Sequence, residues 1–353
     1  MTDPAFVALS LLPIHLWRDI GERLRAGAAP SRALREVVAA RWPDDLQKGS
    51  TLLADAAAAI ARGAACGLGS ISWSDADYPP SLSAIIDPPP VLWTRGRVAA
   101  LNVPAVAIVG SRAASPYALS VAEQLAGDLA ACGLAVVSGL ARGVDSAAHR
   151  GALTGHGVTV AVLGSGVDVM YPPEHATLAA AIEEDGAVIS ELVPGTPPQA
   201  FFFPLRNRII SGLSRAVVVI EANEKSGSLI TARCALEQGR DVLAVPGNVL
   251  SGRNRGGHGL LRDGAKIVES ADDILEELGM AHRPPAATQD LTRLDKDPVL
   301  ACLLPGEPCD LEAIAERSGL SSSRLLPRLF EFELQGLVRR VGGGRFVRTV
   351  RTC

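Results

Sequence analysis

Four short loops rich in Gly and Ser each follow an apolar run and lead into a helical stretch. Small residues in such loops let an oxyanion approach bare backbone N–H groups, and the N-terminus of the next helix adds roughly half a positive charge. Three cations accompany the loops, at Arg112, Arg142 and Lys225. One such loop is often only a tight strand-to-helix connection, but several with cations on one edge favour phosphate binding. The loops span residues 110–112, 138–145, 164–168 and 221–228.

A run of aromatic residues precedes two guanidinium groups within residues 201–208. Phe202 and the Phe on either side of it are candidate platforms for stacking nucleobases. Arg206 and Arg208 are candidate phosphate clamps, because a planar guanidinium matches the oxygens of a phosphate. Packing in the core or at an interface is the alternative role of the Phe run.

Residues suited to acid–base or metal chemistry lack the spacing that such chemistry needs. Asp145 and His149 lie four residues apart at the start of a helical stretch, where an N-capping Asp and a packed His compete with an acid–base pair. Asp168 is expected to cap a helix or to orient a loop. The chain has no P-loop motif, no Gly-x-Ser-x-Gly motif and no third Gly at dinucleotide spacing. These patterns disfavour nucleotide hydrolysis of the P-loop type and binding of NAD, and we expect no metal site and no cofactor. Three further carboxylates also lack metal-ligand spacing, Glu191, Glu221 and Glu224.

Six short apolar runs alternate with helical stretches through the middle of the chain. Most are continuously apolar, as in strands that are buried on both faces of a parallel sheet. The alternation predicts right-handed βαβ units, and hence an α/β fold with a Rossmann-like, doubly wound, mostly parallel sheet. Ligands of such sheets bind beyond the carboxyl ends of the strands, where the Gly- and Ser-rich loops lie. The runs are residues 105–109, 134–137, 159–163, 187–189, 216–220 and 242–245.

The composition divides the chain into a core and flanking units. Residues 1–69 have helical spacing and predict a small helical domain of the SAM or helix–hairpin–helix kind. Residues 70–280 predict the Rossmann-like core, whose Pro-rich lead-in, 70–104, is expected to wrap over a surface rather than form an internal strand. Residues 281–296 are typical of a linker. Residues 297–353 predict a winged-helix-like domain, because helical stretches precede a Gly-turned hairpin. The predicted helices of that domain span 297–304, 311–318 and 321–335.

Charge and cysteine content exclude several classes of protein. The 34 Lys and Arg residues and 38 Asp and Glu residues give a net charge of −4, which excludes a globally basic binder but not a local positive groove. The six Cys residues form no Cys-x-x-Cys pair, which favours a reducing cytoplasm over a disulfide framework. No basic region precedes the first apolar stretch and no apolar run reaches roughly 18 residues, so we expect neither a signal peptide nor a membrane span.

Several motifs, in order over about residues 75–270, resemble those of the DprA/Smf family of DNA-processing proteins. The resemblance implies a cytoplasmic, Rossmann-like core that binds single-stranded DNA, and double-stranded DNA more weakly, without catalysis. It also implies a homodimer that protects incoming strands and loads RecA onto them in natural transformation and homologous recombination, with single-strand-binding protein as a further partner. The motifs are residues 110–112, 138–145, 161–168, 203–214, 226–232 and 244–247.

The family motif assigns DNA contacts to Arg112 and to the run of residues 206–208, with small residues lining the phosphate path. The Gly- and Ser-rich loops add their cations and small residues to this set, and the Phe run adds its central residue, Phe202. The resulting candidate residues for binding DNA or phosphate are Gly110, Ser111, Arg112, Ser138, Gly139, Arg142, Gly143, Phe202, Arg206, Asn207, Arg208, Lys225, Ser226, Gly227 and Ser228.

Two other functions are alternatives. A nucleoside-phosphate hydrolase on a lysine-decarboxylase-like Rossmann core would carry Pro-Gly-Gly-x-Gly-Thr followed by a Glu, and residues 225–232 lack both. A winged-helix regulator with a ligand-sensing core would need a more basic recognition helix than residues 321–335, which mix Arg with Glu. Duplex DNA and a protein partner are equal candidates for what the C-terminal unit binds.

Overall fold

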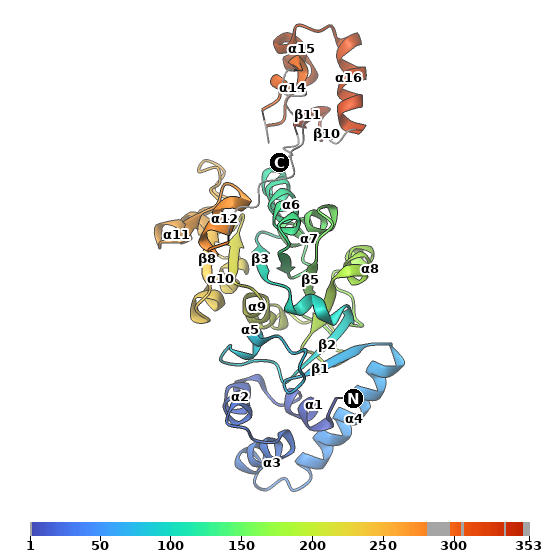
Figure 1. The fold of residues 1–353 in the computed structure, drawn as a ribbon, viewed down its shortest axis with the longest axis vertical. Coiled ribbons are helices and arrows are strands. Elements are labelled where there is room, and N and C mark those ends of the chain that lie inside the picture. The colour runs from blue at the N-terminus through green and yellow to red at the C-terminus, as the bar shows by residue number, and fades with distance from the viewer. Residues whose placement is uncertain (1, 281–296, 305–306, 335–336, 349–353) are drawn as a thin grey trace.

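The computed structural model describes residues 2–280, 297–304, 307–334 and 337–348. A helical unit lies at one end of an elongated molecule, an α/β core in the middle, and a smaller unit of helices and a hairpin at the opposite end (Figure 1). Nowhere in these ranges does a helix have the length and apolar character that crossing a membrane requires.

The N-terminal unit consists of helices that pack through their apolar residues. Asp3 caps the first helix, because its side chain accepts a hydrogen bond from the backbone N–H of Ala5 at 2.8 Å. The apolar core of this unit continues onto the sheet through Trp93, and Gly63 permits that approach since a Cβ there would lie 2.5 Å from the Trp93 ring. The helical content predicted for this region is confirmed, and its domain boundary stays a prediction. The elements are α1 (Pro4–Ser10), η1 (Ile14–Leu16), α2 (Trp17–Arg25), α3 (Pro30–Arg41) and α4 (Lys48–Ala65).

The core contains a nine-stranded sheet in the order β1-β2-β6-β5-β4-β3-β7-β8-β9. The seven strands from β6 to β9 in this order are parallel, whereas β2 pairs antiparallel with both β1 and β6. The six predicted strands are confirmed to within one residue at each end, because their apolar runs are buried on both faces. The strands are β1 (Gly69–Ser72), β2 (Val91–Gly96), β3 (Ala105–Val109), β4 (Ala135–Ser138), β5 (Thr159–Val162), β6 (Ala187–Ser190), β7 (Ala216–Val219), β8 (Asp241–Ala244) and β9 (Lys266–Ile267).

The expectation that residues 70–104 hold no internal strand is wrong. β2 lies inside the sheet, between β1 and β6. The Pro residues that precede β2 do not interfere with strand pairing, because the run of Pro ends at Pro90 and the hydrogen-bonded ladder begins at Val91. Pro90 even contributes its carbonyl, which accepts a hydrogen bond from the Trp73 N–H at 3.0 Å. Pro thus delimits this strand rather than excluding it.

Helices cover both faces of the sheet, as the doubly wound prediction requires. Along β3, Val106 and Ile108 pack in one apolar cluster with α6 and α7, and Ala107 and Val109 pack in another with α9. The helices and 3₁₀ turns of the core are α5 (Pro80–Ser83), η2 (Val98–Asn102), α6 (Pro116–Ala131), α7 (Val144–Thr154), η3 (Pro173–His175), α8 (Ala176–Asp185), α9 (Phe202–Leu213), α10 (Ser228–Glu237), α11 (Arg255–Arg262) and α12 (Ala271–Glu277).

The strand order reverses between β3 and β7. From β3 the chain adds β4, β5 and β6 in one direction, and it then returns to add β7 and β8 on the other side of β3. The loops that follow β3 and β7 therefore diverge to opposite sides of the sheet. In open α/β sheets, a crevice for ligands forms at such a point.

The C-terminal unit has an apolar core of its own, which includes the fully buried Phe332. Asp310 caps its second helix by accepting from the Ala313 N–H at 2.8 Å, and Gly319, with φ of 69°, ends that helix in the left-handed region. The predicted three helices and hairpin are confirmed, and the predicted linker, 281–296, lies outside the described residues. The elements are α14 (Pro298–Ala301), α15 (Leu311–Ser318), α16 (Ser322–Leu334), β10 (Val338–Val341) and β11 (Arg345–Arg348).

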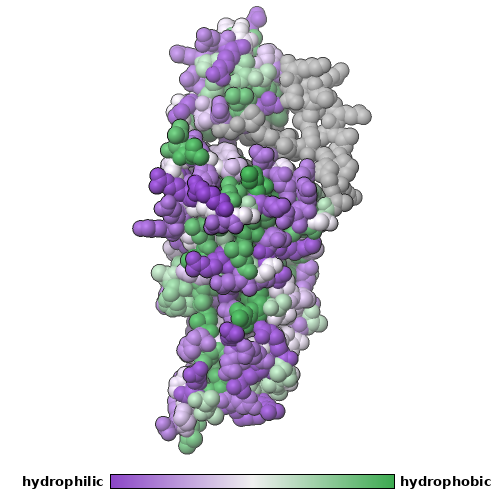
Figure 2. Space-filling view, turned by 90° about the vertical axis from the view of Figure 1, so that its left-hand side faces the viewer, coloured by the Kyte–Doolittle hydropathy of each residue, from purple (hydrophilic) through white to green (hydrophobic). Residues whose placement is uncertain are grey.

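The edge of the sheet that ends in β9 exposes apolar side chains. Figure 2 shows apolar patches among polar residues on the side of the molecule that carries α10 and α11. Ile267 of β9 is 56% exposed, and Leu250, in the loop before α11, is 93% exposed. An exposed edge strand with apolar neighbours is a surface on which a second chain can pack.

Candidate nucleic-acid interface

A cavity of about 690 Å³ lies beyond the carboxyl ends of β3, β4 and β7, where the strand order reverses. We call this cavity the strand-end groove. Its walls come from the loops after these strands, from the segment before α9, and from the first turns of α9 and α10. Its lining residues are Val109, Gly110, Ser111, Arg112, Ala113, Ala141, Asp145, Tyr171, Pro198, Ala200, Phe203, Pro204, Arg206, Asn207, Ile210, Asn223, Ser226, Gly227, Ser228 and Thr231.

Arg112 is the exposed cation of the groove lining. Its guanidinium carbon lies 5.1 Å from the centre of the Phe203 ring, and that ring is 5.4 Å from the ring of Tyr171. Stacking on an aromatic face orients a guanidinium without using its N–H donors. The groove therefore has a wall of two rings with a cation whose donors are available to a ligand.

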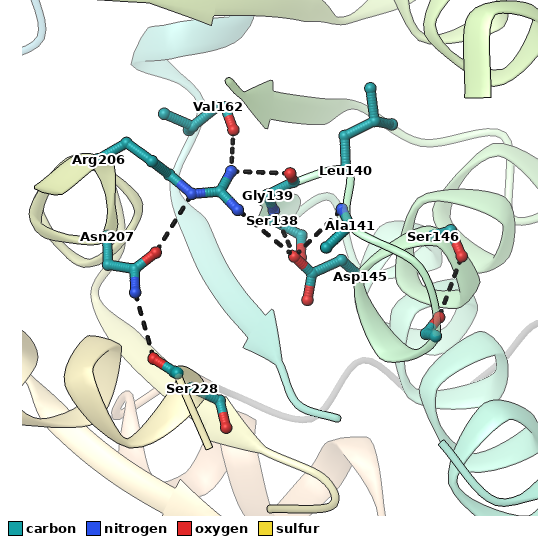
Figure 3. A network of polar contacts seen from close by, with 12 residues as sticks. Ser138, Gly139, Leu140, Ala141, Asp145, Ser146, Val162, Arg206, Asn207 and Ser228 are labelled. Carbon is teal, nitrogen blue, oxygen red and sulfur yellow. Dashed lines mark hydrogen bonds and ion pairs between the residues drawn. The ribbon is translucent and has the colours of Figure 1, made fainter. Parts of the chain in front are cut away.

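Arg206 lines the same groove, but protein oxygens engage its guanidinium (Figure 3). Nη1 donates to the carbonyls of Gly139, at 2.7 Å, and of Val162. Nη2 lies 3.9 Å from Oδ2 of Asp145, and Nε donates to Oδ1 of Asn207 at 3.2 Å. Burial lowers the pKa of Arg206 to about 10, which leaves the group protonated at neutral pH. Arg206 thus ties the ends of β4 and β5 to α9.

Asp145 completes this network from the start of α7. Its Oδ2 accepts hydrogen bonds from the N–H groups of Gly139, at 3.1 Å, and Ala141, at 3.4 Å. Burial raises the pKa of Asp145, and the charge of Arg206 opposes that shift. Gly143 occupies the N-cap position, so the expectation that Asp145 caps the helix is wrong. Its carboxylate holds the preceding loop instead.

His149 takes no part in this network. Its Nδ1 lies 2.7 Å from the hydroxyl of Thr159, which itself donates to the carbonyl of Val136. This chain of donors assigns the proton to Nδ1 and leaves Nε2 buried without a partner among the described residues. His149 is therefore a packed residue between α7 and the sheet, as the alternative to an acid–base pair anticipated.

Arg208 lies in a different place, on the buried side of α9. Its Nη1 and Nη2 donate to the two oxygens of Glu191 at 3.1 and 2.7 Å, and its Nε donates to Asp87 at 3.1 Å. The guanidinium carbon is also 5.1 Å from the ring of Trp17 in the N-terminal unit. Arg208 does not line the strand-end groove. Its partners give it a structural position, joining α9 to β6 and to the N-terminal helices.

The loop after β7 supplies small polar residues to the groove. The hydroxyls of Ser226 and Ser228 lie 2.7 Å apart, and the Gly227 carbonyl accepts from Nδ2 of Asn207 at 3.2 Å. A Cβ on Gly227 would meet no atom within 4 Å, so the backbone is open to solvent there. Lys225 is exposed on the same loop, beside the lining residues rather than among them.

Two glycines are required where the loops cross. Gly143 has φ of 78°, and a Cβ on it would collide with the carbonyl of Ser111. A Cβ on Gly139 would collide with the guanidinium of Arg206. Gly143 therefore allows the loops after β3 and β4 to pack against each other, and Gly139 leaves room for the Arg206 side chain from α9. They act through the backbone and do not line the cavity themselves.

The groove thus brings together part of the predicted set. The structure places Gly110, Ser111, Arg112, Arg206, Asn207, Ser226, Gly227 and Ser228 in its lining. It places Ser138, Gly139, Arg142, Gly143, Phe202, Arg208 and Lys225 outside the lining.

Two of the residues outside the groove lining have protein partners that account for their positions. The hydroxyl of Ser138 is buried and donates to the Ile108 carbonyl at 2.6 Å. Arg142 is exposed and pairs with Glu174 at 2.5 Å, an interaction that raises the pKa of Arg142.

Sequence reasoning missed several lining residues. Phe203, rather than Phe202, faces the groove, while Phe202 packs 4.2 Å from the exposed ring of Phe201. Tyr171 and Asn223 also line the groove. Both follow strands at the carboxyl edge of the sheet, where ligands of such sheets bind, so their place in the sequence could have identified them as lining residues. No group of three His, Cys, Asp or Glu side chains within the described residues has the arrangement of a metal site.

Sequence comparison finds matches for most of the chain. The family described as DNA recombination-mediator protein A matches residues 69–279, and the DprA winged helix domain matches residues 281–344. Protein Smf of Escherichia coli (strain K12) is 42% identical over 285 residues, which cover 78% of this chain and 76% of that protein. The DNA processing protein DprA of Streptococcus pneumoniae is 48% identical over 208 residues, which cover 59% of this chain and 73% of that protein.

Solved structures agree with the sequence matches. The X-ray structure of DNA processing protein A from Streptococcus pneumoniae superposes with a TM-score of 0.68 at 36% identity, and covers 80% of this chain and 99% of that one. DNA processing protein A from Helicobacter pylori, described for its single-stranded DNA binding mode, gives a TM-score of 0.55 at 29% identity, over 60% of this chain and 95% of that one. The predicted α/β fold with a C-terminal winged-helix domain is therefore confirmed.

Proposed function

We propose that this chain, which belongs to the DprA/Smf family of DNA-processing proteins, binds single-stranded DNA along the strand-end groove and acts by binding rather than by catalysis. The observation that carries the proposal is the position of Arg112, an exposed guanidinium stacked on Phe203 in a cavity at the switch point of the sheet. The description of the Helicobacter pylori protein as a binder of single-stranded DNA supports it.

In this proposal the groove recognises a strand by its backbone and its ring faces. Arg112 donates to a phosphate, and the loops around Ser111 and Gly227 offer backbone N–H groups to neighbouring phosphates. Phe203 and Tyr171 provide faces on which bases stack, an interaction that every base can make. Duplex DNA binds more weakly, because its bases are already stacked on each other.

The buried arginines have an indirect role in this proposal. Arg206 fixes the ends of β4 and β5, and Arg208 fixes α9 against Glu191. A groove whose walls are held by buried charge pairs loses little conformational freedom when a strand binds. Direct contacts of Arg206 and Arg208 with phosphate are therefore not part of the proposal, whereas Arg112 is central to it.

The hydrolase alternative has less support. Asp145 is the carboxylate in the groove lining, and its Oδ2 already accepts two backbone N–H bonds and faces Arg206. A nucleophile or general base needs a carboxylate oxygen directed at substrate. The engaged position of Asp145 favours a binding role.

The finer elements of the proposal follow from the family. We propose that the chain protects incoming single strands and loads RecA onto them in the cytoplasm, with single-strand-binding protein as a further partner. We also propose a homodimer, formed at the sheet edge where Ile267 and Leu250 are exposed. An apolar sheet edge of this kind suits pairing between identical chains.

Fluorescence anisotropy with a labelled oligo-dT tests the proposed groove. Arg112→Ala should weaken binding by about 1.5–3 kcal/mol, or roughly 10- to 150-fold, because a charge-assisted hydrogen bond to phosphate is lost. The slope of log affinity against log salt should become shallower by about 0.7, the value for one phosphate contact. Arg150→Ala is the control, since Arg150 is an exposed cation on α7 that pairs with Glu123 away from the groove. Equal affinities of the two variants at low salt would reject the groove as the binding site.

A further inference from the structure

A second cavity, of about 560 Å³, opens on the other side of the loop that follows β3. It lies between the start of α6, the end of β7 and the loop after β8, and its lining includes Tyr117, Glu221 and Arg253. The two cavities share the connecting loop, because Arg253 donates from Nη1 to the carbonyl of Ala113, which lines the strand-end groove, at 3.1 Å. The second cavity therefore borders the strand-end groove across this loop.

Glu221 is the unusual residue of this cavity. It is 94% buried at the end of β7, and one of its oxygens accepts from the backbone N–H of Ser115 at 3.1 Å. No other partner of its carboxylate is found among the described residues, although a carboxylate accepts about four hydrogen bonds. A buried carboxylate with unused acceptor capacity at a cavity wall calls for a ligand that donates hydrogen bonds.

The same carboxylate excludes an anion from the cavity. The start of α6 offers little to a phosphate, because Pro116 has no N–H, the Ser115 N–H is taken by Glu221, and the Ser115 hydroxyl accepts from Ala118. Asn254 is likewise committed, since it accepts from Ala222 N–H and donates to the Val245 carbonyl. The cavity therefore suits a neutral ligand with N–H donors, rather than a phosphate.

We infer that the second cavity holds a guanine base of a strand whose backbone lies in the strand-end groove, an inference that rests on the proposed function. Guanine carries two adjacent N–H donors on one edge, which a carboxylate accepts as a pair. Adenine and cytosine place a ring acceptor next to their amino group, and thymine has a single N–H between two carbonyls. Glu221 therefore selects guanine among the four bases.

Two further residues that line the second cavity match the ring face and the other edge of guanine. Tyr117 is 44% exposed at the cavity, with its hydroxyl anchored to the Pro246 carbonyl at 3.2 Å, so its ring offers a face for stacking. Arg253 has donors beyond the one given to Ala113, and guanidinium groups pair with O6 and N7 of guanine. A carboxylate on one edge and a guanidinium on the other match guanine and no other base.

The test compares three labelled strands of equal length by anisotropy: oligo-dT, oligo-dT with isolated dG residues spaced along it, and the same strand with deoxyinosine in place of dG. The unmodified protein should bind the dG strand about tenfold more tightly than oligo-dT, because paired donors discriminate by that order. The inosine strand should fall between them, since inosine keeps one of the two N–H donors. Isolated dG residues avoid four-stranded structures.

Glu221→Gln is the informative variant, because a Gln oxygen can still accept from Ser115 while its amide group opposes the donors of guanine. It should abolish the preference for dG and leave oligo-dT affinity within about twofold. Glu224→Gln removes the same charge from an exposed position that lines neither cavity, and it should keep the preference. Tyr117→Phe should keep it as well, whereas Tyr117→Ala should reduce it.

The outcomes separate this inference from the proposed function. Equal binding of oligo-dT and the dG strand overturns the inference while the groove stands. A preference for dG that survives Glu221→Gln means that another site recognises guanine, and this result also overturns the inference. Absence of binding to every strand overturns the proposed function and the inference with it. A separate experiment without DNA measures the binding of free dGMP. If dGMP binds as tightly as the dG strand and its binding depends on Glu221, the second cavity is a site for a free nucleotide, and its role in strand binding is overturned.

Discussion

The substitution Arg208→Met tests whether Arg208 supports the structure of the groove or binds DNA directly. Arg208 makes a two-pronged ion pair with Glu191, whose side chain is 1% exposed, and a further bond to Asp87. Met has a similar length and keeps the apolar contact with Trp17 but carries no charge. The substitution therefore leaves the Glu191 carboxylate buried without its cation.

The expected cost in the free energy of unfolding is about 3–5 kcal/mol, the range found when one partner of a buried ion pair is removed. Burial raises the pKa of Glu191, and Arg208 opposes that shift. Without Arg208 the pKa rises further, so protonation of Glu191 limits the cost and the loss of stability is largest at high pH. The double variant Arg208→Met with Glu191→Met should recover most of the loss, because an apolar pair fits the same site.

Urea denaturation followed by circular dichroism measures the stability, and anisotropy with oligo-dT measures binding below the unfolding transition. We expect the double variant to bind the strand within about threefold of the unmodified protein, since Arg208 does not line the groove. Full stability of the single variant combined with a loss of DNA affinity above tenfold would refute this reasoning and restore Arg208 as a direct phosphate contact.

Three further outcomes follow from particular residues. Phe203→Ala should weaken binding of oligo-dT by about 1–3 kcal/mol through lost stacking, measured by anisotropy, while Phe202→Ala, whose ring lies outside the groove, should cost less than half as much. Burial lowers the pKa of His149 from 6.5 to about 3, so the unfolded chain binds the extra proton between these values. Stability from this group is complete above pH 6.5 and falls by up to about 1.4 kcal/mol per pH unit as the pH drops towards 3, and His149→Gln should flatten that slope in urea denaturation relative to the unmodified protein. Ile267→Asp should shift the proposed homodimer to monomer in light scattering, and Leu46→Asp, at a 92% exposed apolar residue of the N-terminal unit, should not.

Most of the fold could be predicted because its strands are buried on both faces. Residues 105–109 are continuously apolar, and the structure places β3 at the same bounds. Three strands of the sheet were not predicted, β1, β2 and β9. Of these, β2 is equally apolar at Val91 and Leu92 but follows three Pro residues. Its pairing with β6 joins residues nearly a hundred positions apart, and no local pattern encodes that contact.

The site was harder to predict, because the direction of a side chain depends on partners that are remote in sequence. Arg206 and Arg208 lie two positions apart on α9, and residues two apart on a helix face different directions. Arg206 reaches Asp145 and the end of β4, while Arg208 reaches Glu191 and Asp87. Their shared motif is visible in the sequence, but these acidic partners are not.

The burial of these arginines also determines which cations of this acidic chain can attract a phosphate. The net charge is −4, and the guanidiniums of α9 are balanced by buried carboxylates, so they add little field outside the protein. Attraction of DNA then depends on the exposed cations at the rim, of which Arg112 lines the groove and Lys225 lies beside it. Because few phosphates are neutralised by so few charges, the dependence of affinity on salt should be shallow for each chain. Base stacking, and the second groove of the proposed homodimer, would then supply the rest of the affinity.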